Sequence, residues 1–442
     1  MRLINTNTGE FETFWDTERP QYAILSHTWG ADEVSYLDYL VLTSKLPATS
    51  TGLIHALLKS PHAAAGGDSA GMRKVQECRK LARRRGLDWV WVDTCCIDSS
   101  SSAELSEAIN SMWSWYRDAA ECYVYLQSTK KIGGLLRCFD DAAAAAALKI
   151  QFAKSRWFQR GWTLQELLAP RHEVLFCNAR WEILASKAEI VHELSAITSI
   201  PLVFLDGSVS PADNRLCSIA MRMSWLARRQ TTRVEDMAYC MLGLFDVHMP
   251  LIYGEGRKAF MRLQLEILKK SDDDSIYAWK SPTPMHKSGL LATWPTAFAD
   301  SGNIVQLVFV DDPTPWIPPV MTSIGLEMRG RYERDDPHQD AVDARHGVHT
   351  IHTAINNDSE MCLFMFCGPL RNNQEDTADD ELPITRQSKH LDREKVLSLV
   401  LRRQGATWQR VNCNALDFVD YTMCRPRKME AYNIFYVDQQ GL

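Results

Sequence analysis

The chain has 442 residues, more than one hydrophobic core usually serves, so we expect two or three domains. Its net charge is −6, and no dominant basic stripe is present, which argues against a nucleic-acid binder. No apolar run reaches 18 residues and the polar start lacks a hydrophobic signal core, so we expect no membrane span and no secretion.

The twelve cysteines are scattered along the chain, and several of them lie inside apolar runs. This distribution is typical of reduced, buried thiols rather than of a disulfide framework. We therefore expect a cytoplasmic protein.

The first predicted elements alternate between strand and helix. The apolar run Tyr22–Ser26 predicts a buried strand, and the Ala-, Gly-, Ser- and Pro-rich stretch 53–71 predicts an inserted loop. A helix should follow and end at Gly86, because glycine favours the left-handed conformation beyond a helix end. One face of this helix carries Val75, Cys78, Leu81 and Ala82.

The next stretch repeats this alternation. Residues 88–94 predict a second strand, and Cys122–Leu126 predict a third. The helix between them should bury one face, made of Leu105, Ile109, Met112, Tyr116 and Ala119. Residues 129–153 contain an alanine run and form a second predicted insertion, in which alanine favours helix.

A helix over Trp157–Leu168 should end before Pro170, followed by a strand at Glu173–Cys177 and a helix at Lys187–Ile197. Four alternations of strand and helix predict an α/β domain with a mainly parallel sheet covered by helices on both faces. We assign this domain to residues 1–200.

The remaining chain changes character twice. Apolar residues recur at helical spacing from Cys217 to Leu268, so residues 201–280 are predicted to be a helical segment. After Trp279, short β-prone runs alternate with polar or proline-rich links, so residues 281–442 are predicted to form a β-rich domain.

The motif SHTWG follows the first predicted strand. Ligands of parallel sheets bind beyond the carboxyl ends of the strands, so Ser26, His27, Trp29 and Gly30 are candidates for binding a ring and a phosphate. The alternative is structural: Trp29 covers the core and Gly30 allows a tight turn.

Two further residues follow the second strand. Asp93 either binds a ribose hydroxyl or anchors its loop. Glu104 lies three residues after Ser101, the spacing of a capping box, so its carboxylate is expected to bond a free backbone N–H.

The segment RWFQRGWTLQELL gathers aromatic, basic and acidic side chains. Glu166 lies near tryptophans, whose apolar surroundings raise a carboxyl pKa, and near arginines, which lower it. Such a group suits acid–base work or a hydrogen bond to a sugar hydroxyl. The alternative is a second capping box, from Thr163 to Glu166. Further binding candidates here are Arg156, Trp157 and Trp162.

No metal site is expected. Cys95 and Cys96 are adjacent without a second cysteine pair, and His346, His349 and His352 lie in a predicted strand that would scatter them over both faces. No glycine-rich phosphate loop is present either. We expect no resident cofactor.

Three blocks closely resemble the fungal heterokaryon incompatibility (HET) domain. They are YAILSHTWG, the stretch WVWVDTCCIDSSSSAELSEAINSMWSWYRDA, and SRWFQRGWTLQELLAP. The stretch TTRVEDMAYCMLGLFDVHMPLIYGEGRKAFMRLQLEI resembles the segment that follows the HET domain in many family members. The resemblance implies a role in non-self recognition and cell death when incompatible fungal cells fuse.

HET domains are thought to be distant relatives of TIR domains, which implies a TIR-like, flavodoxin-like fold. TIR enzymes that cleave NAD carry a serine after the first strand and a W-C-x-x-E-L motif with a catalytic glutamate. Ser26 and Trp162–Leu167 match, with Thr163 in place of the cysteine. By this analogy Glu166 is catalytic, NAD is a substrate, and Trp29, Trp157 or Trp162 stacks on a ring.

Two hypotheses follow from the resemblance. One is an NAD glycohydrolase that acts as a death effector. The other is a non-enzymatic signalling module that works by homotypic association. Expected partners are an incompatibility partner protein or other HET domains, with oligomerisation on activation, and the trigger should be sensed by the β-rich domain or another chain.

Overall fold

The computed structural model describes the chain in separate stretches. These are residues 1–15, 18–43, 69–127, 150, 152–213, 217–285, 287–308, 318–333, 351–357, 360–365, 367–369, 386–387, 395–404, 406–420, 433–437 and 439. The predicted insertions 53–71 and 129–153 lie outside these residues except at their ends. The chain divides into two compact units, Met1–Ser208 with Cys240–Leu244, and Val209–Tyr239 with Phe245–Leu442. The predicted division into three domains stays a prediction.

The first unit is built on a seven-stranded sheet with the order β2-β1-β4-β3-β5-β6-β7. The strands are β1 (Arg2–Asn5), β2 (Phe11–Thr13), β3 (Ala23–His27), β4 (Trp89–Trp91), β5 (Glu121–Leu126), β6 (Glu173–Asn178) and β7 (Ile183–Ser186). The four central strands are parallel, and β1, β2 and β7 complete the edges in antiparallel fashion. This confirms the mainly parallel α/β class.

The central strands follow the spatial order of a flavodoxin-like doubly wound sheet, with the first strand between the second and third. In this arrangement β3 is the strand at which the chain reverses its winding direction. All five residues of β3 are buried, as expected for a strand covered on both faces. The carboxyl end of β3 is therefore where a ligand site is expected on topological grounds.

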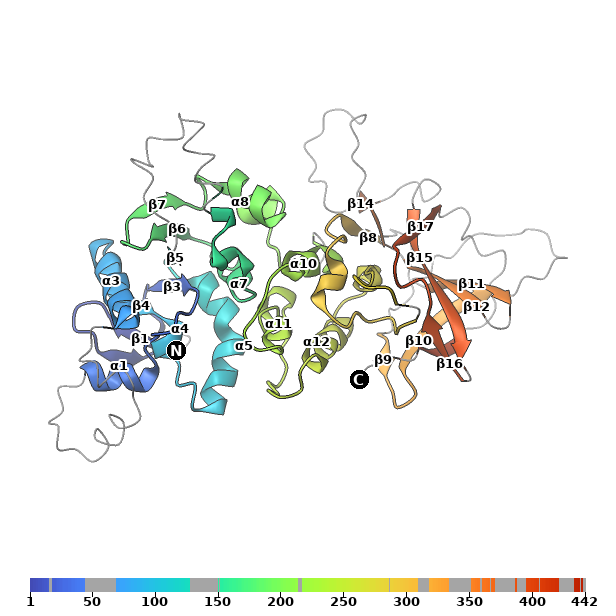
Figure 1. Cartoon of the computed structure of the whole chain (residues 1–442), viewed down its shortest axis with the longest axis horizontal. Coiled ribbons are helices and arrows are strands. Elements are labelled where there is room, and N and C mark those ends of the chain that lie inside the picture. Colours follow the sequence, from blue (N-terminus) through green and yellow to red (C-terminus); the bar gives the residue numbers. More distant parts are fainter. Residues whose placement is uncertain are drawn as a thin grey trace. The chain divides into compact units, whose positions relative to one another are not determined.

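Helices cover both faces of this sheet (Figure 1). They are α1 (Tyr36–Thr43), α3 (Ala70–Arg84), α4 (Asp93–Cys96), α5 (Ser102–Asp118), α7 (Thr163–Leu168), α8 (Val191–Thr198) and α9 (Leu202–Leu205). The predicted apolar face of α3 is buried, and Gly86 follows its end in the left-handed conformation, with a φ of 82°. Ser101 caps α5 as predicted, and the Glu104 carboxylate accepts from the backbone N–H of Asp98 at 2.8 Å.

The single helix predicted over Trp157–Leu168 is wrong. A 3₁₀ turn, η4 (Arg156–Gln159), is followed by a break and then by α7. The Thr163 hydroxyl spans this break, because it bonds the carbonyl oxygens of Trp157 and Arg160 and so ties η4 to the start of α7. Thr163 lies inside α7, and its N-cap Trp162 makes no side-chain capping bond, so the second capping box is not formed. The helix predicted from Lys187 begins later, at Val191.

The second unit begins with helices and continues with strands, as the residue pattern predicts. Its helices are α10 (Ile219–Leu226), α11 (Asp236–Tyr239) and α12 (Lys258–Leu268). Its strands are β8 (Ile304–Val308), β9 (Val320–Met321), β10 (Leu326–Glu333), β11 (Ile351–Asn357), β12 (Glu360–Met365), β13 (Cys367–Pro369), β14 (Arg386–Gln387), β15 (Lys395–Gln404), β16 (Thr407–Arg410), β17 (Asp417–Asp420) and β18 (Asn433–Val437).

The larger sheet of this unit runs β11-β12-β15-β16-β18-β10-β9, and β10 also pairs with β11, so six of its strands close into a ring. Arg410 of β16 is fully buried, and its guanidinium donates to the carbonyls of Tyr277 and Trp279. Burial lowers the pKa of Arg410 to about 10. Of the three predicted strand histidines, His352 lies in β11, and the other two lie outside the described residues.

Among the helices that the structure describes, none has the length and apolar character needed to cross a membrane. The cysteines whose side chains the structure describes are buried free thiols, as the sequence predicts.

Candidate functional site

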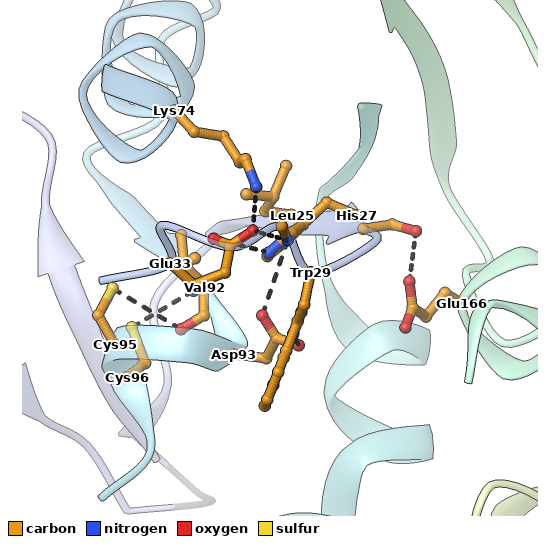
Figure 2. Close-up of polar contacts among 12 residues, drawn as sticks. Leu25, His27, Trp29, Glu33, Lys74, Val92, Asp93, Cys95, Cys96 and Glu166 are labelled. Atoms are coloured by element: carbon orange, nitrogen blue, oxygen red, sulfur yellow. Dashed lines mark hydrogen bonds and ion pairs between the residues drawn. The ribbon is translucent and has the colours of Figure 1, made fainter. Parts of the chain in front are cut away.

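The carboxyl end of β3 sends consecutive side chains to opposite faces of the sheet, as a strand must. Ser26 meets Glu166 of α7 on one face, and His27 lies with Glu33 and Lys74 on the face covered by α3. The candidates predicted as one site therefore form two clusters. Figure 2 shows Glu166 apart from the group of His27, Glu33, Lys74 and Asp93.

The first group, here called the glutamate cluster, consists of Ser26, Trp157 and Glu166. The Ser26 hydroxyl donates to Oε2 of Glu166 at 2.5 Å, and the Trp157 indole Nε1–H donates to the Ser26 oxygen at 2.8 Å. These residues come from β3, η4 and α7. All are buried, and Glu166 is 4% exposed. Two residues 140 positions apart thus form a short, enclosed hydrogen bond.

Aromatic rings surround the glutamate cluster, together with two weakly acidic side chains, Tyr116 and Cys122. The Trp157 ring packs edge-on against Phe158 and Phe176, with centroid distances of 4.9 and 5.8 Å. Burial raises the pKa of Tyr116 and of Cys122 well above their usual values, and the negative charge of Glu166 raises both further. At neutral pH both groups therefore stay protonated beside the carboxylate.

The second group, here called the histidine cluster, consists of His27, Glu33, Lys74 and Asp93. The buried imidazole lies between two carboxylates: Nε2 is 3.5 Å from Glu33 Oε2, and Nδ1 is 3.7 Å from Asp93 Oδ1. The Lys74 ammonium pairs with the other Glu33 oxygen at 2.5 Å. These contacts join the loop after β3 to the start of α4 and to α3 (Figure 2).

The charge of Glu33 is stabilised in this cluster. Burial alone would raise its pKa, but hydrogen bonding and charge from His27, together with the charge of Lys74, lower it to about 2. Glu33 therefore stays ionised over the physiological range.

The loop between the two clusters presents an exposed indole. Trp29 is 53% exposed, and its Nε1–H donates to Asp93 Oδ2 at 2.8 Å. The backbone N–H of Gly30 donates to Glu33 at 2.7 Å. Both bonds hold the Trp29 ring in place at the strand end, so it is available for stacking without further ordering. Asp93 thus anchors the loop, one of the two roles considered for it.

The remaining candidates are more exposed than the glutamate cluster. Arg156 is exposed at the start of η4, and Trp162 is half-buried just before α7. Trp157 differs from the other two candidate tryptophans, Trp29 and Trp162, because it is 1% exposed, which leaves its ring no free face for a ligand. In the described part of the chain, no group of three His, Cys, Asp or Glu side chains is arranged to hold a metal ion.

Glu33 and Lys74 were missed in the sequence, and no local signal marks them. They meet because α3 begins directly against the loop after β3: the Gly71 N–H bonds the Asp32 carbonyl at 3.1 Å. A side chain at Gly71 would place its Cβ 2.2 Å from that same carbonyl oxygen. The glycine is therefore the residue that permits the approach.

Comparisons with known proteins agree with the three motif blocks. Residues 22–166 match the family model described as "Heterokaryon incompatibility protein (HET)". The chain is 44% identical over 295 residues to "Vegetative incompatibility protein HET-E-1" of Podospora anserina, which covers 65% of this chain and 19% of that protein. It thus spans about a fifth of that relative's length. No solved structure matches the chain. The stretch that holds both clusters, residues 22–166, is thus similar to the heterokaryon incompatibility (HET) domain.

Proposed function

We propose that this chain acts in fungal vegetative incompatibility, with the HET domain as the part that triggers death of incompatible fused cells. The observation that carries this proposal is the 44% identity over 295 residues to a vegetative incompatibility protein. The stretch that matches the HET family model, residues 22–166, has its two ends joined by the Ser26–Glu166 bond.

For the mechanism we propose NAD cleavage by Glu166. The supporting geometry is a carboxylate on α7 that already accepts from a hydroxyl, with a fixed, exposed indole on the neighbouring loop. A ribose hydroxyl would donate to the second carboxylate oxygen of Glu166, Oε1, while the Ser26 hydroxyl keeps its bond to Oε2. The bond between ribose C1′ and the nicotinamide nitrogen then breaks, nicotinamide leaves with the electron pair, and water adds to C1′ and loses a proton.

A second mechanism is favoured by a different observation. Ser26 is fully buried and Glu166 is 4% exposed, so in this conformation their bond also serves as a core contact. A buried, satisfied carboxylate stabilises a domain without any substrate. In that case the HET domain acts as a signalling module by homotypic association, and the charge of Glu166 matters only for folding.

The substitution Glu166→Gln separates the two mechanisms, because it keeps the volume and removes the charge. Under NAD cleavage, purified variant protein should release nicotinamide at least about 100-fold more slowly than wild type, and its expression should no longer kill fungal cells. Glu107→Gln, on the exposed side of α5, is the matched control and should remain toxic.

Toxicity that persists in a folded Glu166→Gln variant would rule out the NAD mechanism and support the module. If wild-type protein does not kill fungal cells at all, the incompatibility role itself is wrong. Nicotinamide release should be assayed at high protein concentration with a crowding agent, which favours assembly.

A further inference from the structure

Trp157 is the member of the glutamate cluster that has no role in the proposed reaction. An indole N–H is a donor only, so the 2.8 Å bond from Nε1 must end on a lone pair of the Ser26 oxygen. The single hydroxyl proton of Ser26 is then free to point elsewhere, and the Glu166 oxygen lies 2.5 Å away. The three side chains form a chain of donors with one direction, from Trp157 to Ser26 to Glu166.

The burial of these atoms makes that direction matter. Ser26 is 0% and Trp157 is 1% exposed, so water does not compete for their hydrogen bonds. Hydrogen bonds in series polarise one another in a low-dielectric interior. A donor on the Ser26 oxygen therefore strengthens the donation from Ser26 to the carboxylate and keeps that carboxylate in one orientation.

The indole itself is held from the other side. Its ring packs edge-on against Phe158 and Phe176, and the Thr163 hydroxyl bonds the Trp157 carbonyl from the first turn of α7. The helix that carries Glu166 is thus tied to the backbone of Trp157 as well as to its side chain. These contacts leave the ring unavailable for stacking and fix where its N–H points.

We propose that Trp157 is a positioning residue of the HET domain: acting through the Ser26 hydroxyl, its indole N–H orients the Glu166 carboxylate toward substrate. This inference rests on the proposed NAD cleavage. It assigns Trp157 no contact with substrate, and it leaves ring stacking to the exposed Trp29.

The test compares Trp157→Phe with Trp91→Phe. Both tryptophans are fully buried, but the Trp91 indole nitrogen makes no hydrogen bond within the described residues, so this variant removes a similar volume without removing a donor. We expect Trp157→Phe to lower kcat for nicotinamide release about tenfold at unchanged KM, and Trp91→Phe to leave kcat within about twofold. Thermal unfolding of both variants reports any loss of fold.

A second measurement needs no activity. In protein labelled with ¹⁵N-tryptophan, the indole N–H signal of Trp157, assigned in wild type through the ring contacts of Trp157 with Phe158 and Phe176, should move in both Ser26→Ala and Glu166→Gln. The Trp91 signal should stay in place. If the chemical shift of the Trp157 signal is unchanged in Glu166→Gln, the hydrogen bonds from Trp157 to Ser26 and from Ser26 to Glu166 are not coupled, and the proposal is wrong. This readout also decides the matter if Trp157→Phe does not fold.

The outcomes separate the two proposals. If wild-type protein releases no nicotinamide, NAD cleavage fails and the positioning role fails with it. If wild type is active while folded Trp157→Phe turns over as fast as Trp91→Phe, the positioning role alone is wrong.

Discussion

At the scale of single residues, the neighbours Ser26 and His27 point to opposite faces of the sheet. Ser26 joins the glutamate cluster and His27 joins the histidine cluster, because successive strand side chains point in opposite directions. The SHTWG motif therefore contributes residues to two separate clusters, and the partners of each residue come from the helix packed against that face.

The charge of Glu33 leads to a prediction about pH. Its folded pKa of about 2 is below the ordinary value of 4.5, so its stabilising contribution is complete above about pH 4.5 and is lost as the pH falls toward 2. We expect Glu33→Gln to cost on the order of 3 kcal/mol of unfolding free energy at pH 7 and roughly half of that or less at pH 3. Urea unfolding of wild type and variant at both pH values measures this.

Glu107→Gln serves as the control for the change in net charge, since its side chain is exposed on α5. A deficit for Glu33→Gln that is equally large at pH 3 and pH 7 would show that the carboxylate is not stabilised by His27 and Lys74.

At the scale of elements, the start of α3 decides whether the histidine cluster forms. Lys74 reaches Glu33 only because Gly71 lets the first turn of α3 touch the backbone of Asp32–Val34. The break between η4 and α7 has a similar role on the other face, because it separates Trp157 from Glu166 so that both reach Ser26.

We expect Gly71→Ala to destabilise the protein by about 1–3 kcal/mol, because its Cβ would overlap the Asp32 carbonyl oxygen. Gly30→Ala is the matched control from the same loop region, since its Cβ would meet only a Glu33 oxygen at 3.6 Å. Denaturant midpoints compare the two. Equal midpoints for both variants would mean that the close approach of α3 is not required.

At the scale of the whole molecule, the two units depend on different buried polar groups. The second unit places the fully buried Arg410 of β16 against the backbone carbonyls of Tyr277 and Trp279, with its guanidinium 4.4 Å from the Trp279 ring centroid. A buried guanidinium that serves as the donor for several carbonyls is costly to remove, because those carbonyls lose their partners.

Arg410→Met should therefore destabilise the second unit by at least about 2 kcal/mol. Peptide-resolved hydrogen exchange should show faster exchange in residues 277–292 and 407–413, with β3 unchanged. Faster exchange of equal size in β3 would show that the two units unfold together.

Local pattern alone was enough to predict much of this protein. The apolar runs of β3, β5 and β6 and the periodic faces of α3 and α5 are local signals, since buried strands and amphipathic helices leave their period in the residues themselves. They were enough to predict the α/β class, and the motif blocks were enough to predict the similarity of residues 22–166 to the HET domain.

Only the tertiary structure decided which of the candidates meet. Strand order and crossover direction bring α7 to one face of β3 and α3 to the other, and neither leaves a local trace. Ser26 and Glu166 are 140 residues apart in the sequence. Trp157 was predicted to stack on a ligand ring, but its neighbours enclose it, and it is a buried hydrogen-bond donor instead. Contacts between distant segments form only when the helices and strands pack together. Local sequence patterns therefore do not reveal them.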